Sequence, residues 1–114
     1  MDYLNASQVA ECSYYFNVTS PLSFVLTASL VQGVAVSSYL SAVSMLQDPS
    51  LRTVVSSVLA VEARQSSFVR AALGQQPFAS PFDTPITLNE AYELAELYTP
   101  SCPKSNPDLG LKVC

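Results

Sequence analysis

The sequence predicts an all-α fold in which two long helices pair as an antiparallel hairpin and a short third helix follows. Ser20-Pro21 and Asp48-Pro49 each place a capping side chain directly before a proline at the first helical position. Thr87 and Glu90 have the spacing of a capping box, which marks the start of the third helix. These three start signals and the helical spacing of apolar residues between them define the fold class.

The first helix is expected over residues 21–46, and its most unusual property is that it carries no charge. No charged residue occurs between Cys12 and Gln47, and the stretch 22–46 is long enough to cross a bilayer. Its serine, threonine and glutamine side chains dilute the hydrophobicity, and its flanks lack lysine and arginine anchors. We therefore expect a helix buried on most sides by protein, and we do not expect a membrane span.

The second helix is expected over residues 49–73, with Gly74 as a left-handed C-terminal cap. The joint between the two helices is so short that it forces them to run antiparallel. Apolar positions recur at three- and four-residue spacing along this helix, and Glu62 and Gln65 fall on the same stripe. The stripe consists of Leu51, Val54, Val55, Val58, Glu62, Gln65 and Val69.

A proline-rich connector, residues 75–85, separates the hairpin from the third helix, which is expected over residues 88–98. We expect this connector to lie across the bundle with Phe78 and Phe82 inserted. The third helix is expected to turn a short apolar face inward, formed by Leu88, Ala91, Tyr92 and Ala95, with Tyr98 as a further candidate.

The chain is short enough for a single domain. We divide it into an N-terminal segment (1–19), a helical region (20–99) and a C-terminal tail (100–114), which we expect to be extended.

Composition excludes several classes of function. The net charge of −4 and the five scattered basic residues argue against a nucleic acid partner, which needs clustered lysine and arginine. The sequence contains no histidine, so neither a Ser-His-Asp nor a Cys-His catalytic arrangement is available. Three glycines are too few for a phosphate-cradling loop.

Two N-glycosylation sequons, at Asn5 and Asn17, favour an extracellular or cell-surface protein that passes through the secretory pathway. The three cysteines, Cys12, Cys102 and Cys114, allow at most one disulfide within the chain. The first residues show no basic region and no apolar run, so a leader is absent or already removed, or the chain belongs to a longer secreted protein.

Glu62 and Gln65 are the first candidate site residues, because helical bundles hold iron or manganese with a glutamate and a histidine three residues apart. A carboxylate that faces a core is costly unless a partner or a metal compensates it. Counted back from Asp48 at about 1.5 Å per residue, Gln32 lies at the height of this pair. The three side chains form either a buried hydrogen-bond cluster that satisfies Glu62 or the frame of a metal site.

Several motifs are spread over about residues 10 to 110. They are the segments Cys12–Phe16, Gln32–Leu40, Val61–Gln65, Pro77–Phe78, Pro81–Pro85, Asn89–Glu90 and Ser101–Pro103. In their order and spacing, these segments resemble the ferritin-like family of fungal stress-response and plant desiccation-related proteins.

The resemblance implies a bundle in which one helix offers a glutamate and the next offers Glu-x-x-His, repeated in two halves. One half is present here, with Gln32 at the lone glutamate position, Glu62 at the second glutamate and Gln65 at the histidine. Neutral amides are weaker ligands for iron than carboxylate and imidazole, so we expect no resident cofactor, with iron or manganese at Glu62 as the alternative. The resemblance also implies a Cys12–Cys102 disulfide, which leaves Cys114 unpaired.

A helical hairpin cannot hide its apolar face unaided, so we expect two chains to pair into a four-helix bundle, or a second chain to supply the other half. The preferred function is a secreted or cell-surface ferritin-like protein without intrinsic catalysis, with a structural or partner-binding role in stress or desiccation. The alternative is a di-iron-type oxidoreductase in which Glu62 from two chains, with water and Tyr39, holds a metal.

Overall fold

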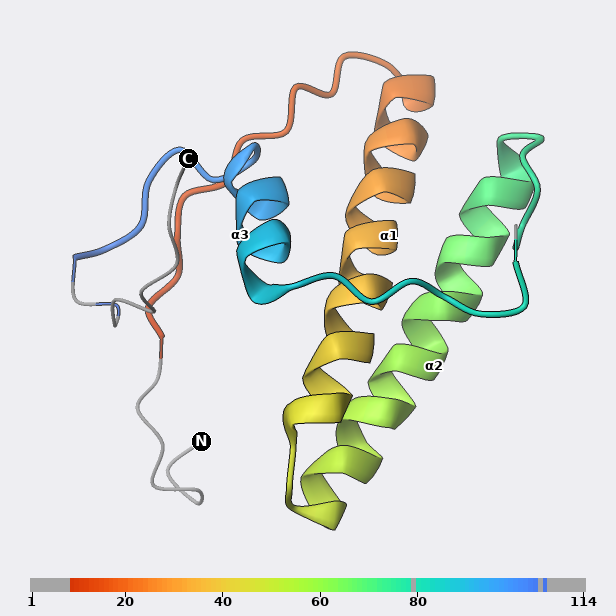
Figure 1. Cartoon of the computed structure of the whole chain (residues 1–114). Helices are drawn as coiled ribbons and strands as arrows, with labels where there is room; N and C mark the ends of the chain where they lie inside the picture. Colours follow the sequence, from red (N-terminus) through yellow and green to blue (C-terminus); the bar gives the residue numbers. More distant parts are fainter. Residues whose placement is uncertain (1–8, 79, 105, 107–114) are drawn as a thin grey trace.

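The computed structural model describes residues 9–78, 80–104 and 106. Helix α1 (Pro21–Met45) and helix α2 (Pro49–Ala72) form an antiparallel hairpin, and helix α3 (Leu88–Glu96) packs on α1. Helix α1 lies between the other two (Figure 1). The predicted ranges of 21–46, 49–73 and 88–98 end within two residues of these bounds.

Side chains in the turn between the helices hold the hairpin closed. The Asp48 carboxylate accepts hydrogen bonds from the backbone amides of Ser50 (2.7 Å) and Leu51 (3.0 Å), which satisfies two free donors at the start of α2. The bonds from Leu51 and then Ser50 lower the pKa of Asp48 below its ordinary value. Arg52, on α2, reaches back across the turn, where its guanidinium donates two hydrogen bonds to the Leu46 carbonyl oxygen, at 2.6 and 3.2 Å.

The two other helix starts are capping boxes. Ser20 accepts from the Ser23 amide, and Ser23 Oγ accepts in return from the Ser20 amide. Thr87 and Glu90 form the predicted box at α3, and the Thr87 backbone and hydroxyl donors lower the pKa of Glu90. Local sequence therefore fixes where each helix begins.

Gly74 terminates helix α2 two residues after its last helical residue, as the sequence predicted. Gly74 has φ of 70°, and its amide donates to Ala71 while the Gln75 amide donates to Arg70. This is a Schellman motif, which satisfies the last carbonyls of the helix.

The N-terminal segment is joined to the chain that follows α3. The Ser13 amide donates to Ser101 (2.8 Å) and the Tyr15 amide to Tyr98 (2.9 Å), while the rings of Phe16 and Tyr98 stack at 5.1 Å. The segment therefore runs past α3 before it enters α1 (Figure 1).

Two further links close the same region. A disulfide joins Cys12 to Cys102, 90 residues apart. The Asn106 carboxamide accepts from the Ala10 amide (2.7 Å) and donates to its carbonyl (2.9 Å), a pairing that the sequence did not reveal. The disulfide stabilises the fold by about 4 to 5 kcal/mol in the chain-entropy estimate.

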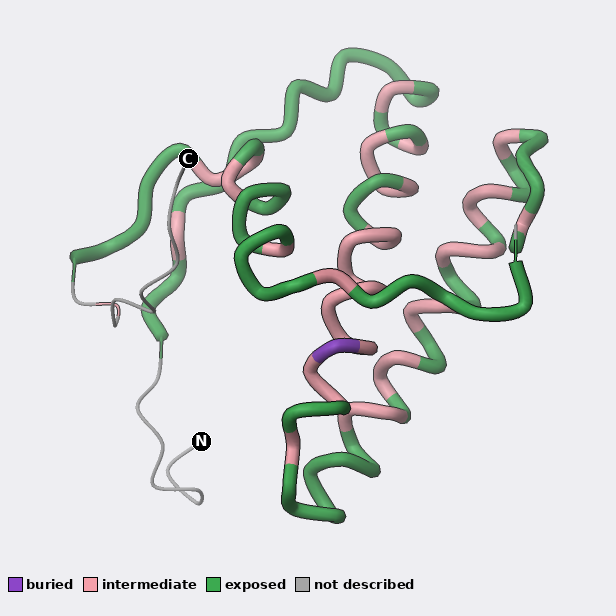
Figure 2. The backbone as a smooth tube through the Cα atoms, viewed as in Figure 1, coloured by how far each residue is buried: buried purple, intermediate pink, exposed green. Residues whose placement is uncertain are grey.

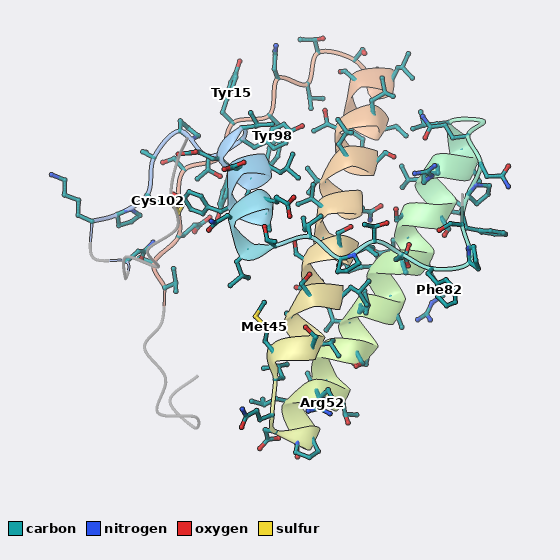
Figure 3. All side chains as sticks on the ribbon, in the orientation of Figure 1. Tyr15, Met45, Arg52, Phe82, Tyr98 and Cys102 are labelled. Carbon is teal, nitrogen blue, oxygen red and sulfur yellow. A yellow bond between two sulfur atoms is a disulfide. The ribbon has the colours of Figure 1, made fainter. Side chains whose placement is uncertain are left out.

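The connector crosses one face of the hairpin on its way to α3 (Figure 1). Its end is held by the next residue, Ile86, whose carbonyl accepts a hydrogen bond from the hydroxyl of Ser41, a buried α1 residue. The prediction that Phe78 and Phe82 insert is wrong, because these residues are 70% and 82% exposed. Phe82 lies on the connector beside α2 (Figure 3). The helix surface beneath the connector is rich in serine and offers these rings little apolar contact.

The prediction that α1 is buried on most sides is also wrong for the single chain. Among the described residues only Val36 and Ser41 are buried, and nearly the whole backbone is half-buried or exposed (Figure 2). Helix α2 covers one side of α1, and α3 and the connector cover another, which leaves much of its apolar surface open. By length and composition α1 is the one described helix that passes the test for a membrane span.

Helix α3 likewise turns less of its apolar surface inward than predicted. Ala91 is half-buried, but Leu88, Tyr92 and Ala95 are exposed. The helix has only nine residues and, of the other two helices, contacts only α1, so the hairpin covers one narrow strip of it.

We predict opposite effects for two glycine substitutions. Gly74→Ala will destabilise the protein by about 1 to 2 kcal/mol, because its φ of 70° is strained for any residue with a Cβ atom. Gly33→Ala will stabilise it by about 0.5 to 1 kcal/mol, because Gly33 is inside α1 and an added Cβ meets nothing within 4 Å. Urea unfolding measures the free energy of unfolding of both variants. Two changes of the same sign would contradict the backbone conformations described for Gly74 and Gly33.

Candidate functional site

The side chains of Gln32 and Gln65 meet between α1 and α2. Gln32 is half-buried on α1, Gln65 is exposed on α2, and Gln32 Nε2 donates to Gln65 Oε1 at 3.0 Å. Because the hairpin turns tightly at Asp48, residues at equal distance from the turn lie at similar height, and the two glutamines are 16 and 17 residues from it. The hydrogen bond thus matches the register expected from the sequence.

Glu62 lies one turn before Gln65 on α2 and is half-buried. The expected cluster in which the two amides satisfy this carboxylate does not form, because Gln32 and Gln65 bond to each other. The Glu62 carboxylate accepts no hydrogen bond from the described part of the chain. Because the residue is only half-buried, the solvent can hydrate this charge. The prediction of a buried cluster around Glu62 is therefore wrong in this respect.

One atom of this pair has no partner. Gln32 Oε1 is buried and makes no hydrogen bond to the described residues. Exchanging the oxygen and nitrogen of both carboxamides keeps the bond between them but puts Gln32 Nε2 in the same buried position. One polar atom is therefore left unsatisfied in either assignment, at a cost of about 1 to 3 kcal/mol.

The donor set does not fit a di-iron or di-manganese centre. Such centres use carboxylates and imidazoles, whereas the residues gathered here are one carboxylate and two amides that are engaged with each other. In the described residues, no group of three or more histidine, cysteine, aspartate or glutamate side chains comes together.

A hollow of about 530 Å³ lies beneath the connector and was not predicted. Hydroxyl side chains from both helices line it, together with Asp83 and Arg70, whose Nε donates to the Gln76 carbonyl at 2.9 Å. Neighbouring serines on α2, Ser66 and Ser67, were the available sequence signal. None of the predicted site residues contributes to this hollow.

Comparison with known families bears directly on the hairpin. The model of a family described as a ferritin-like domain matches residues 2–75, which include α1, α2 and all three candidate ligand positions. The chain belongs to this ferritin-like family. A search of curated proteins found no match. Two of the three positions that the sequence resemblance implied as metal ligands therefore carry amides in this ferritin-like chain.

The remaining predicted site residues lie apart from this pair. Asn17 is exposed in the N-terminal segment, and Tyr39 is half-buried on α1. The second sequon, at Asn5, and the third cysteine, Cys114, lie outside the described residues.

We predict that the two glutamines are energetically coupled. Gln65→Met alone will destabilise the protein by about 1 kcal/mol, because it leaves the half-buried Gln32 amide without its partner. Gln32→Met combined with Gln65→Met will recover most of this loss, because both polar groups are then replaced by apolar groups of similar shape. A double-mutant cycle at one protein concentration measures the coupling, and additive single effects would show that the bond contributes nothing.

Proposed function

We propose that this protein is a ferritin-like half-bundle without intrinsic catalysis that acts by binding a second helical element against its hairpin. The observation that carries this proposal is that α1 is incompletely covered, with most of its residues only half-buried. In its most apolar stretch, with a mean hydropathy of 1.4, only 6% of the residues are buried within the chain.

Large exposed side chains support the same conclusion. Phe24 and Leu30 on α1 and Phe68 on α2 are each at least 60% exposed. Extended apolar surface on a soluble protein is typical of a binding site, because leaving it in water costs free energy that a partner recovers. A structural or partner-binding role therefore suits this surface better than an enclosed catalytic site.

The absence of catalysis is proposed from donor chemistry. Glu62 is a single carboxylate beside two amides, and amide oxygens bind iron more weakly than carboxylate or imidazole. The alternative, an oxidoreductase with iron or manganese held by Glu62 from two chains, relies on this poor donor set.

The proposed location is extracellular or at the cell surface. The Cys12–Cys102 disulfide suits an oxidising compartment, and the exposed Asn17 side chain is accessible for glycosylation. A role in stress or desiccation is proposed from the resemblance to fungal stress-response and plant desiccation-related proteins.

We predict that protein purified without chelator contains no stoichiometric iron, manganese or zinc, and that Glu62→Ala leaves its metal content unchanged. Elemental analysis of the size-exclusion peak makes the measurement, with Glu93→Ala as a control that removes an exposed carboxylate on α3. Stoichiometric metal that disappears in Glu62→Ala and persists in Glu93→Ala would overturn the non-catalytic proposal.

A further inference from the structure

Two rows of side chains follow alternating steps of three and four residues along the hairpin. The α1 row is Phe24, Ala28, Val31, Ala35, Ser38 and Ala42, and the α2 row is Leu51, Val54, Val58, Val61, Gln65 and Phe68. This is the heptad spacing of helices that pack along one another as in a coiled coil.

Both rows lie on the same face of the hairpin, opposite the connector. Ser37 and Ser67 line the hollow beneath the connector. At 100° per residue, Ala35 and Gln65 lie two positions, or about 160°, around their helices from these two serines. The connector therefore covers one face, and both rows lie on the other, where Val31 also borders a small hollow beside Tyr14, Phe16 and Leu94.

The large members of the rows are open to solvent. The exposed fractions are 60% for Phe24, 59% for Val54 and 76% for Phe68. An uncovered face with heptad spacing on two adjacent helices has the form of half a four-helix bundle.

The two rows are complementary in size. The α2 row is made of large side chains over most of its length, whereas the α1 row has alanine or serine at positions 28, 35, 38 and 42. Large side chains pack best against small ones on a facing helix. A two-fold rotation about an axis along the helices places α2 of one copy against α1 of the other, so one chain supplies both surfaces.

The area of this face is sufficient for a stable dimer. Helices of this length span about 36 Å, and neighbouring helices lie about 8 to 10 Å apart. The face therefore covers about 700 Å² per copy, or about 1,400 Å² for a pair, which falls in the range of specific protein interfaces.

Charge also permits self-pairing. Neither row contains a charged residue, so two copies of the same net charge of −4 bring no like charges together along the rows. Glu62 and Arg64, which both precede Gln65 in the sequence, carry opposite charges. Gln65 is the one polar member of the α2 row, and a single polar residue in such a row fixes the register of pairing.

We propose that the partner is a second copy of this chain, and that α2 of each copy packs against α1 of the other through these rows to complete a four-helix bundle. This inference rests on the proposed function, and it identifies the second helical element as another copy of the same chain. The bundle then encloses Gln65 and covers the exposed apolar side chains of both rows.

The test measures the molar mass of the unglycosylated protein, with its disulfide formed, by sedimentation equilibrium over a series of dilutions. The wild type is expected at twice the mass of one chain, and Val61→Glu is expected to weaken pairing at least about tenfold, because it buries a charge in the row. Ala60→Glu is the matched control, since it places the same charge on the neighbouring exposed residue outside the row, and it should leave pairing unchanged. Circular dichroism checks that each variant retains its helices.

A second measurement tests the proposed arrangement. Ala35 and Val61 are each 13 residues from Asp48, so rotation about an axis along the helices brings Ala35 of one copy to the height of Val61 of the other. In a Cys114→Ser background, a mixture of Ala35→Cys chains and Val61→Cys chains should form crosslinked heterodimers under mild oxidation. Crosslinks that form only between two chains of the same variant, with none between an Ala35→Cys chain and a Val61→Cys chain, would overturn this arrangement.

The outcomes separate this inference from the proposed function. A wild-type monomer at every concentration would overturn self-pairing, as would Val61-dependent binding to phosphatidylcholine vesicles in place of pairing. Neither result bears on the proposed absence of catalysis, which is tested by metal content, whereas vesicle binding would also overturn the proposed binding of a second helical element.

Discussion

The constraint on which this structure depends is that an uncharged helix of 25 residues stands at its centre and has to be shielded from water. Helix α2 shields one side, and α3 with the connector shields another. A short chain has no further helix in its described part to cover the remaining face, so only two residues are buried. The open face, the exposed aromatic side chains and the proposed need for a partner all follow from this shortage of covering surface.

The cover on the α3 side is maintained by links between distant parts of the chain. The Cys12–Cys102 disulfide, the Asn106 bonds to Ala10 and the stacking of Phe16 on Tyr98 fasten the N-terminal segment to the end of α3. These links compensate for a small hydrophobic core, as disulfides do in many small secreted domains. The hairpin itself relies on its caps and on the packing of α1 against α2.

Features set by a few neighbouring residues were predictable. Each helix start follows from Ser20, Asp48 or Thr87, and Gly74 marks the end of α2, because caps are local interactions. The meeting of Gln32 and Gln65 followed from the tight turn. Features that depend on contacts between distant parts of the chain were not predictable. The position of the connector decides how exposed Phe78 and Phe82 are, and the position of the C-terminal segment decides which residue Asn106 contacts. The apolar stripe on α2 was likewise recognised, but its division into a side that faces α1 and a side that remains open required the position of the connector.

If the uncovered face is completed by association, stability must depend on the concentration of the protein. The most direct measurement is therefore the midpoint of urea unfolding, recorded for the oxidised chain over a wide range of protein concentration. The midpoint should rise steadily with concentration, because pairing removes the exposed apolar side chains of α1 and α2 from water. A midpoint that stays the same at every concentration would contradict the account and show that the hairpin is stable with its face open.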